Sequence, residues 1–505
     1  MPRDLNAEPT FQTPDIQGDI LAELPKRCEL LLFFKIQDPK VFKAFLKTLH
    51  ITSMEECLAQ RDLIKRRKEA GIETLVPTPG LNVAFTHKGL TKLGVEGIDG
   101  KQPALEAFRD GMAARTEKGA LTDPDPATWN FPRPGHRPDG VFILTGASEA
   151  EIADTVSLRL APVRGNGWRI LHEELGRVRP DPVKGHEHFG YADGVSQPGV
   201  RGLIADGIPL NASDDPVGNP DQAARGQNLL WPGEFLFGHP SQNQNAAKFT
   251  EKGADAEPPV PFMKDGAYLV FRRLAQLVPE FNSAVKAAAA GIGPASDAAS
   301  AELLGAQMVG RWKSGAPIIK SATKDNPELA EGTPDVNNFK FGEDREGLVC
   351  PWAAHIRKTY PRDDVRQNTN PTDGEIDKAE AFNQTRRMLR RGITFGPELT
   401  EREALSGRSN PDLARGLLFK CYVTSLEDQF EFVQIAWVNS DEFSQKGAGV
   451  DAIIGQSAQD SPRFVGAAPL SRAVNRKPEI NFGRFVKMEG GEYFFSPSIP
   501  AIRAL

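Results

Sequence analysis

Short apolar runs that alternate with helix-like segments constrain the fold of this chain more than any other feature of its sequence. Near the N-terminus, segments with helical spacing of apolar residues, such as Pro39 to Leu49, lie between runs with the composition of β-strands. The resulting β-α-β-β-α-β order predicts an α+β arrangement, an antiparallel sheet with helices packed on one face. The strand-like runs are Cys28 to Ile36, Gly80 to Phe85, Gly140 to Gly146 and Trp168 to Glu173.

The same order of elements returns in the second half of the chain. Ala267 to Leu274 and Gly416 to Tyr422 have strand composition, whereas Leu277 to Ala290, Glu302 to Val309 and Phe430 to Trp437 have helical spacing. A chain of 505 residues is long enough for two large cores. We therefore expect two similar folded units that pack together, although no residue-level repeat links them.

A segment with many proline, glycine, asparagine and aspartate residues separates the two halves. It runs from Gly176 to about Glu257 and shows no sustained helical or strand period. Such a composition is typical of a connection between domains. We predict an N-terminal domain over residues 1–185, a connecting region over 186–265 and a C-terminal domain over 266–505.

The composition excludes several classes of partner. The formal net charge is −6 and the isoelectric point about 5.9, so no basic field is available to bind nucleic acid. We expect no membrane span, because the sequence has no run of about 18 apolar residues. Residues 1–17 lack a basic segment followed by an apolar run. We therefore expect a cytoplasmic protein, or one not exported by a visible signal, although a secreted mature form would look the same.

The segment from Gly185 to Pro198, with the sequence GHEHFGYADGVSQP, carries the densest group of polar functional side chains. It has no helical or strand period, so it predicts a constrained loop in which Asp193 is the candidate chemical centre. His186 and His188 lie two residues apart and could bind a divalent metal together with Asp193. A metal-dependent hydrolase is therefore one hypothesis, although the spacing fixes no third ligand.

A second segment, Cys350 to Arg362, places a histidine after an apolar turn. His355 follows the sequence Pro-Trp-Ala-Ala and precedes Arg357 and Arg362. A neutral imidazole on an apolar wall suits the iron of haem, and nearby guanidinium groups suit the haem propionates. An arginine-rich loop beside a histidine also suits a phosphate site, so the residue types alone leave the chemistry open.

The ordered motifs of this chain resemble those of the dye-decolorizing peroxidases. Gly190-x-x-Asp193-Gly194 followed by Gln197-Pro198 resembles the GxxDG motif of that family, and Cys350 to Arg362 resembles its proximal-histidine segment. The similarity extends almost from end to end and is strongest to the long subgroup that includes fungal enzymes. Its further segments are residues 17–21, 268–274, 310–315, 388–393, 416–419, Trp437 and 451–456.

The resemblance implies two ferredoxin-like domains, each a four-stranded antiparallel sheet with helices packed on it. It also implies one haem b per chain, held mainly by the C-terminal domain. His355 would be the proximal iron ligand, and Asp451 the carboxylate that accepts the other imidazole N–H. Asp193 and Arg390 would act on the distal side, with Arg391 as the alternative arginine. The other implied positions are Leu417 and Phe419 in the distal pocket, Arg357 and Arg362 beside the propionates, and Trp437 as a surface electron-transfer residue.

The implied function is a haem-dependent peroxidase that reduces hydrogen peroxide and oxidises dyes, phenolics and other aromatic donors. Asp193 would move a proton between the two peroxide oxygens, and Arg390 would stabilise the negative charge on the leaving oxygen. A carboxylate has a reference pKa of about 3.9 and works as a base mainly in acid, so we expect an acidic optimum. The alternative is a non-enzymatic haem carrier, which would need neither side chain. The oligomeric state stays open, with a homodimer as one option.

Overall fold

The computed structural model describes residues 8–72, 74–133, 135–160, 167–203, 221–292, 298–456, 463–465, 479–481 and 483–505. Strands from the first part of the chain form an antiparallel sheet in the order β4-β1-β3-β2. This is the strand order of a ferredoxin-like fold. The four strands are β1 (Cys28–Ile36), β2 (Gly80–Phe85), β3 (Gly140–Gly146) and β4 (Trp168–Arg177).

Strands from the second part of the chain form a sheet with the same relative order, β11-β12-β9-β15. A further strand, β10, pairs with β12 on the same edge as β11, so β10 and β11 share one position in the sheet. The prediction of two ferredoxin-like units is confirmed. These strands are β9 (Ala267–Gln276), β10 (Leu389–Arg390), β11 (Ile393–Phe395), β12 (Gly416–Val423) and β15 (Val486–Ser496).

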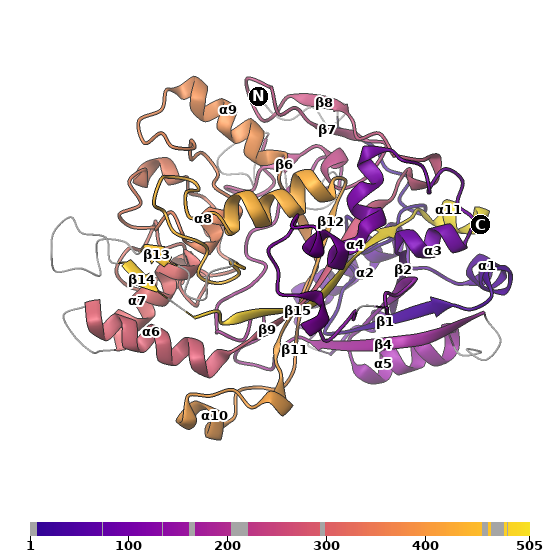
Figure 1. Ribbon diagram of the computed structural model, residues 1–505, viewed down its shortest axis with the longest axis horizontal. Coiled ribbons are helices and arrows are strands. Elements are labelled where there is room, and N and C mark those ends of the chain that lie inside the picture. The colour runs from indigo at the N-terminus through magenta and orange to yellow at the C-terminus, as the bar shows by residue number, and fades with distance from the viewer. Residues whose placement is uncertain are drawn as a thin grey trace.

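The two sheets join at both edges and close into a barrel. One junction is the pair Phe395 and Gly176 between β11 and β4, and the other is the pair Phe495 and Phe85 between β15 and β2. Figure 1 shows the indigo-to-magenta strands of the first sheet beside the pink-to-yellow strands of the second. Each junction is a single residue pair, so the two sheets meet at the ends of their edge strands.

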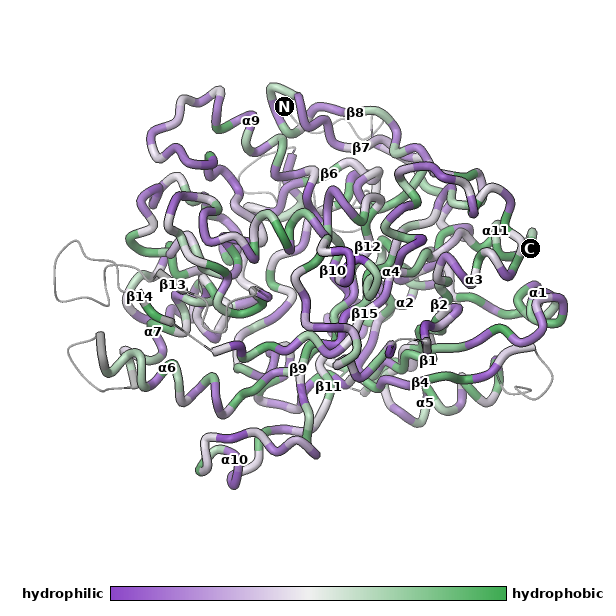
Figure 2. The backbone as a smooth tube through the Cα atoms, viewed as in Figure 1, coloured by the Kyte–Doolittle hydropathy of each residue, from purple (hydrophilic) through white to green (hydrophobic). Residues whose placement is uncertain are grey.

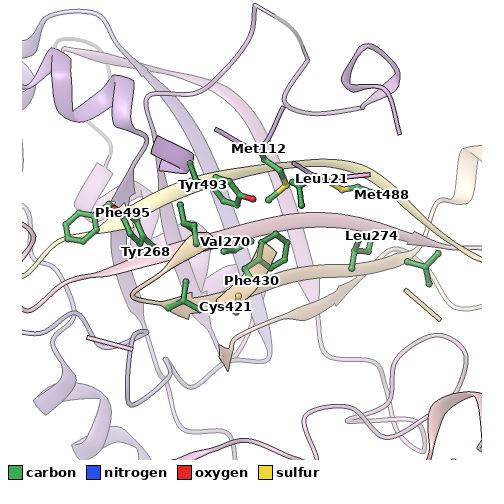
Figure 3. Packing of buried hydrophobic residues seen from close by; sticks show 14 of the residues in the cluster. Met112, Leu121, Tyr268, Val270, Leu274, Cys421, Phe430, Met488, Tyr493 and Phe495 are labelled. Atoms are coloured by element: carbon green, nitrogen blue, oxygen red, sulfur yellow. The ribbon is translucent and has the colours of Figure 1, made fainter. Parts of the chain in front are cut away.

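Each strand contributes to two apolar cores because successive side chains point to opposite faces. Leu31 and Phe33 of β1 lie in the core inside the barrel, whereas the alternating Leu32 and Phe34 lie in the core outside it. Figure 3 shows the outer core over β9, β12 and β15, where Phe430 packs against Tyr493 with ring centroids 6.1 Å apart. Helices therefore cover the outer faces of the sheets.

The helices differ in how many of their apolar side chains are buried. Helix α1 buries Phe42 and Leu46 in the outer core, whereas α2 buries only its first turn, at Met54 and Cys57. In Figure 2 the outlying segment with α9 is mostly hydrophilic. No helix in the described ranges is long and apolar enough to cross a membrane. The helices are α1 (Pro39–Thr48), α2 (Met54–Glu69), α3 (His87–Lys92), α4 (Glu106–Glu117), α5 (Glu149–Thr155), α6 (Val278–Ile292), α7 (Ala298–Val309), α8 (His355–Thr359), α9 (Asp373–Gln384), α10 (Glu401–Ser406) and α11 (Ile499–Ala504).

Short strands and π-helical turns complete the described elements. Two successive π-helical turns, Leu426–Glu431 and Val433–Val438, occupy the region where a helix was expected after β12. The short strands form two-stranded sheets outside the barrel. They are β5 (Gly199–Val200), β6 (Leu229–Leu230), β7 (Pro240–Gln242), β8 (Lys252–Asp255), β13 (Arg463–Val465) and β14 (Glu479–Asn481).

The strand-like runs of the sequence all form barrel strands, but β10, β11 and β15 were not predicted. Strand β15 contains Gly490 and Gly491, and its register shifts between Met488 and Gly490. This bulge breaks the two-residue alternation that marks a strand in a sequence. The domain limits at residues 185 and 265, and the location in the cell, stay predictions.

Candidate active site

One cavity, which we call the inner cavity, brings together segments that are far apart in the sequence. It is lined by residues of the loop 187–198, by His355 at the start of α8, and by Leu417 and Phe419 of β12. Leu418, between these two residues, points into the barrel. The inner cavity therefore lies against the outer face of the second sheet, beside the two residues that the resemblance assigned to the distal pocket.

His355 is held in one orientation by a buried carboxylate. Its Nδ1 donates to Oδ2 of Asp451 at 2.8 Å, and Asp451 is 1% exposed. The other oxygen of Asp451 accepts the backbone N–H groups of Ile453 and Ile454, at 2.8 and 3.0 Å. Because Nδ1 is engaged, Nε2 is the ring nitrogen available to a ligand in the inner cavity.

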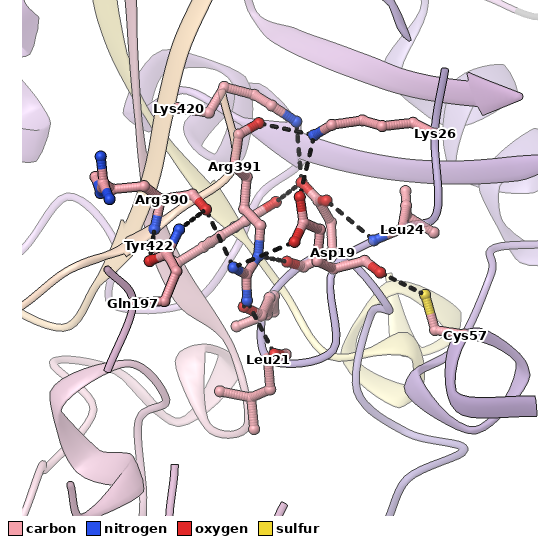
Figure 4. Close-up of polar contacts among 12 residues, drawn as sticks. Asp19, Leu21, Leu24, Lys26, Cys57, Gln197, Arg390, Arg391, Lys420 and Tyr422 are labelled. Atoms are coloured by element: carbon pink, nitrogen blue, oxygen red, sulfur yellow. Dashed lines mark hydrogen bonds and ion pairs between the residues drawn. The ribbon is translucent and has the colours of Figure 1, made fainter. Parts of the chain in front are cut away.

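Asp193 and Arg390 meet at the edge of the inner cavity. Nη1 of Arg390 lies 3.6 Å from Oδ1 of Asp193, and their side chains are 33% and 38% exposed. Nη2 of Arg390 also donates to the carbonyl of Ser196 at 2.7 Å. The amide of Gln197 forms hydrogen bonds with both backbone groups of Arg390, at 3.0 and 3.3 Å (Figure 4). These contacts tie the loop to β10 and hold the carboxylate beside the guanidinium while both stay accessible.

The structure also distinguishes Arg390 from its neighbour. Arg391 is 4% exposed, and its guanidinium donates to the carbonyls of Asp19, Ile20 and Leu21 at 2.9 to 3.1 Å (Figure 4). Arg391 directly follows β10, and successive side chains along extended backbone point to opposite sides, so only one of the two arginines reaches the inner cavity. That residue is Arg390, and Arg391 anchors the N-terminal segment.

The loop that carries Asp193 is shaped by a carboxylate that the sequence analysis did not single out. Glu187 is half-buried at the cavity, and its two oxygens accept the backbone N–H groups of Phe189 and Tyr191 at 2.9 and 2.8 Å. Burial raises the pKa of Glu187 above its ordinary value. Gly190 and Gly194 have φ angles of 95° and 74°, a region that glycine adopts without strain. The tight loop therefore depends on both glycines and on this carboxylate.

Three buried arginines line the inner cavity and lack charged partners. Burial lowers the pKa of Arg311 to about 9 and that of Arg387 to about 10, and it also lowers the pKa of Arg362. In the described structure, the hydrogen-bond acceptors of these guanidinium groups are neutral carbonyl and amide oxygens. Buried cations with neutral partners favour an anionic ligand. Together with the available Nε2 of His355, these cations fit haem and its two propionates.

The position of Arg357 does not favour the predicted contact with a propionate. Arg357 is fully buried and does not line the inner cavity. Its guanidinium forms two hydrogen bonds with Asp364, at 2.6 and 2.7 Å, and lies 3.4 Å from Asp344. The side chain therefore already has anionic partners, and it stabilises the turn that presents His355. Arg362 does line the inner cavity, and its contact with a propionate stays a prediction. Arg311 and Arg387 were not predicted as site residues, but they line the inner cavity too. Arg311 lies in the segment 310–315 and Arg387 directly precedes the segment 388–393, and both segments resemble the family.

The expectation that Trp437 lies at the surface is wrong. Its side chain is 3% exposed and stacks on Phe443, with ring centroids 5.1 Å apart and planes at 11°. The π-helical turn Val433–Val438 directs the indole into a small apolar cluster. A role of Trp437 in electron transfer stays a prediction. In that role, an electron would have to pass through the residues that cover the indole ring.

The geometry does not support a metal site at His186 and His188. The ring of His188 is 6% exposed and bonds to the carbonyl of Phe395 at 2.9 Å, whereas His186 bonds to the carbonyl of Lys184. Among the residues that the structure describes, no group of three His, Cys, Asp or Glu side chains could hold a metal ion. The two histidines instead help to shape the loop.

The buried ring of His188 makes stability depend on pH. Burial lowers the pKa of His188 from 6.5 to about 4. Between these two pH values the ring is protonated in the unfolded chain but neutral in the folded chain. The contribution of the neutral, buried ring to stability is therefore full above pH 6.5 and is lost as the pH falls towards 4. We expect the free energy of unfolding to drop by about 3 kcal/mol from this group.

Denaturant unfolding at the two ends of this pH window measures the effect of His188. His188→Gln can still donate to the carbonyl of Phe395 but does not titrate, so its stability should depend less on pH. The same pH dependence in both proteins would contradict the assignment.

Comparisons with known proteins agree with the fold and the site. A family model described as the DyP dimeric alpha+beta barrel domain matches residues 15–180. The dye-decolorizing peroxidase msp1 of Mycetinis scorodonius is 35% identical over 508 residues, which cover 97% of this chain and 87% of the relative. The dye-decolorizing peroxidase AauDyP1 of Auricularia auricula-judae is 32% identical, over 98% of this chain and 87% of the relative.

Solved structures give the same result. An ancestral D-type dye-decolorizing peroxidase superposes with a TM-score of 0.79 at 35% identity, covering 98% of this chain and 99% of that chain. A fungal DyP-type peroxidase from Auricularia auricula-judae superposes with a TM-score of 0.76 at 30% identity and the same coverage. The barrel and these similarities define the class of the protein as α+β-barrel peroxidases. The chain belongs to the dye-decolorizing peroxidase family, whose members are haem enzymes, and it is itself a peroxidase.

Proposed function

We propose that the inner cavity binds one haem b per chain, with Nε2 of His355 as the protein ligand of the iron. Three features that meet in one cavity carry this proposal: a histidine fixed by a buried carboxylate, an Asp–Arg pair, and three buried arginines with neutral partners. Asp451 keeps the imidazole oriented and makes it a stronger electron donor. Arg311, Arg362 and Arg387 pair with the propionate carboxylates.

Asp193 and Arg390 carry out the acid–base part of the reaction. When bound, haem supplies the electrons that reduce the O–O bond of hydrogen peroxide. Asp193 takes the proton from one peroxide oxygen and returns it to the other, which leaves as water. The fixed charge of Arg390 stabilises the negative charge that develops on the leaving oxygen. Leu417 and Phe419 give the cavity an apolar wall, which strengthens both interactions.

The electron donors are aromatic compounds such as phenolics and dyes. Two phenol molecules each give up one electron and one proton, so one hydrogen peroxide yields two waters and two phenoxyl radicals. A haem carrier needs no acid–base group, and the contact of Asp193 with Arg390 at the cavity supports turnover instead. Two oxidised donors per peroxide is the stoichiometry that this function requires.

Haem titration followed by steady-state kinetics tests the proposal. We expect the absorbance change of bound haem to saturate at one equivalent per chain. The loaded protein should oxidise two equivalents of a small neutral phenol per peroxide, faster in mild acid than at neutral pH. Free haem at the same concentration is the control. Peroxide consumption no faster than that of free haem would contradict the proposed function.

A further inference from the structure

A buried lysine that takes no part in the proposed reaction lies close to His355. Lys358 follows it by three residues on α8, and its side chain is 0% exposed. Its Nζ donates to the carbonyl of Ser440 at 2.7 Å and to that of Phe443, and among the described residues no carboxylate forms an ion pair with it. Because carbonyl groups compensate a buried ammonium only in part, this charge costs stability and points to a function.

Lys358 and His355 hold the same segment of the chain, residues 438–451. His355 contacts its last residue, Asp451, at 2.8 Å, whereas Lys358 contacts the two carbonyls near its start. The backbone N–H of Asp451 donates to the carbonyl of Val438 at 3.0 Å, which closes the segment into a loop. These contacts fix the position of the ammonium group relative to the carboxylate that orients the imidazole.

The buried carboxylate of Asp451 is the main negative charge that acts on Lys358. Burial lowers the pKa of Lys358 to about 7, and the negative charges of Asp451 and then of Asp441 oppose this shift. Asp441 is exposed, so solvent screens its charge, whereas Asp451 is buried. Charges interact strongly in surroundings of low dielectric constant. Below pH 7 the amine is protonated and acts chiefly on Asp451.

The charge of Lys358 opposes the effect of Asp451 on the imidazole. A carboxylate that accepts the N–H of a ligating histidine makes the imidazole more basic and favours the ferric state of a bound iron. A cation near that carboxylate stabilises its negative charge, so the carboxylate accepts the hydrogen bond less strongly. The ferric state also carries one more positive charge than the ferrous state, and a nearby cation disfavours it. Both effects raise the reduction potential.

We propose that Lys358 is a positioning residue that raises the reduction potential of the bound haem, acting through Asp451 on His355. The inference rests on the proposed haem site. Asp451 on its own makes the iron a weaker oxidant, and the buried cation limits that effect. The balance between the two charges keeps phenols with electron-withdrawing substituents, which are harder to oxidise, within the range of donors.

Redox titration of the haem-loaded protein at pH 5, where the amine is protonated, tests the inference without turnover. Lys358→Met keeps the apolar stem and removes the charge. We expect the ratio of ferrous to ferric haem at a fixed applied potential to fall about tenfold, a shift of about 59 mV for one electron. Lys358→Arg keeps the charge and should shift the potential less. Lys358→Gln, which is neutral but can still donate to a carbonyl, repeats the test if the first variant loses its haem.

Resonance Raman spectra of the ferrous protein separate an effect on Asp451 from a general loss of structure. The iron–histidine stretching frequency rises when the imidazole gains basicity. It should therefore rise in Lys358→Met, because Asp451 then accepts the N–H of His355 more strongly. A loosened segment 438–451 would weaken that hydrogen bond and lower the frequency instead.

The matched control is Lys446→Met, which removes the same charge from an exposed position of the segment 438–451. Its potential should stay close to that of the wild type, because solvent screens an exposed charge. Equal shifts in Lys358→Met and Lys446→Met, or an iron–histidine frequency that falls or stays unchanged in Lys358→Met, would overturn the inference. A wild-type protein that binds no haem, or binds it without His355, would refute the proposed function instead.

Discussion

Asp193→Asn is expected to slow the reaction of the haem-loaded protein with hydrogen peroxide by about 10² to 10⁴-fold, the usual contribution of a positioned acid–base group. The amide has nearly the same shape as the carboxylate but cannot take up the peroxide proton. Oδ1 of Asp193 accepts the N–H of Gly194 at 2.7 Å, and an amide oxygen can keep that contact. Haem content should therefore stay at the wild-type value while the rate falls.

Stopped-flow absorbance measured against peroxide concentration gives this rate directly. Asp255→Asn, an exposed change on β8 that does not line the inner cavity, is the matched control and should react like the wild type. An unchanged rate in Asp193→Asn would remove the acid–base role. Loss of haem from the same variant would show instead that the carboxylate mainly holds the loop in place.

His355→Ala is expected to weaken haem binding by more than about 100-fold. Loss of a residue that only supports a ligating histidine already costs about 10 to 100-fold in metal affinity, and this change removes the ligand itself. The side chain of His355 borders the inner cavity, and its removal leaves Asp451 buried without its partner. Added imidazole can fill the space and restore a nitrogen ligand.

The haem content after gel filtration, measured with and without imidazole, tests this prediction. His87→Ala changes a histidine that is bonded to the carbonyl of Ile98 and does not line the inner cavity, so it should keep its haem. Full haem retention by His355→Ala without imidazole would mean that another side chain binds the iron.

The sequence predicts those secondary-structure elements in which apolar side chains recur at a regular spacing. The apolar runs give most barrel strands, because the alternation of inward and outward side chains leaves a signal in the sequence. Strand β15 escapes detection because Gly490 and Gly491 interrupt that alternation. The choice between Arg390 and Arg391 could be made only from the structure. Adjacent side chains on extended backbone point to opposite sides, and the sequence does not show which side borders the cavity.

The partners of charged side chains are the least predictable part of the site. Arg357 and Arg362 both follow His355 closely, yet Asp344 and Asp364 pair with Arg357, whereas Arg362 lines the inner cavity with neutral partners. His355 and Asp451 lie 96 positions apart, so only the family resemblance connected them before the structure did. The sequence supplies the charges, but tertiary packing decides which of them are compensated.

An anomalous difference map at the iron absorption edge, from crystals of the haem-loaded protein, tests whether the inner cavity is the haem site. We expect a single strong iron peak per chain in the inner cavity, within bonding distance of Nε2 of His355. Asp193 and Arg390 should border the same haem. An iron peak bound to another residue, or a haem located outside the inner cavity, would mean that His355 is not the iron ligand of this protein.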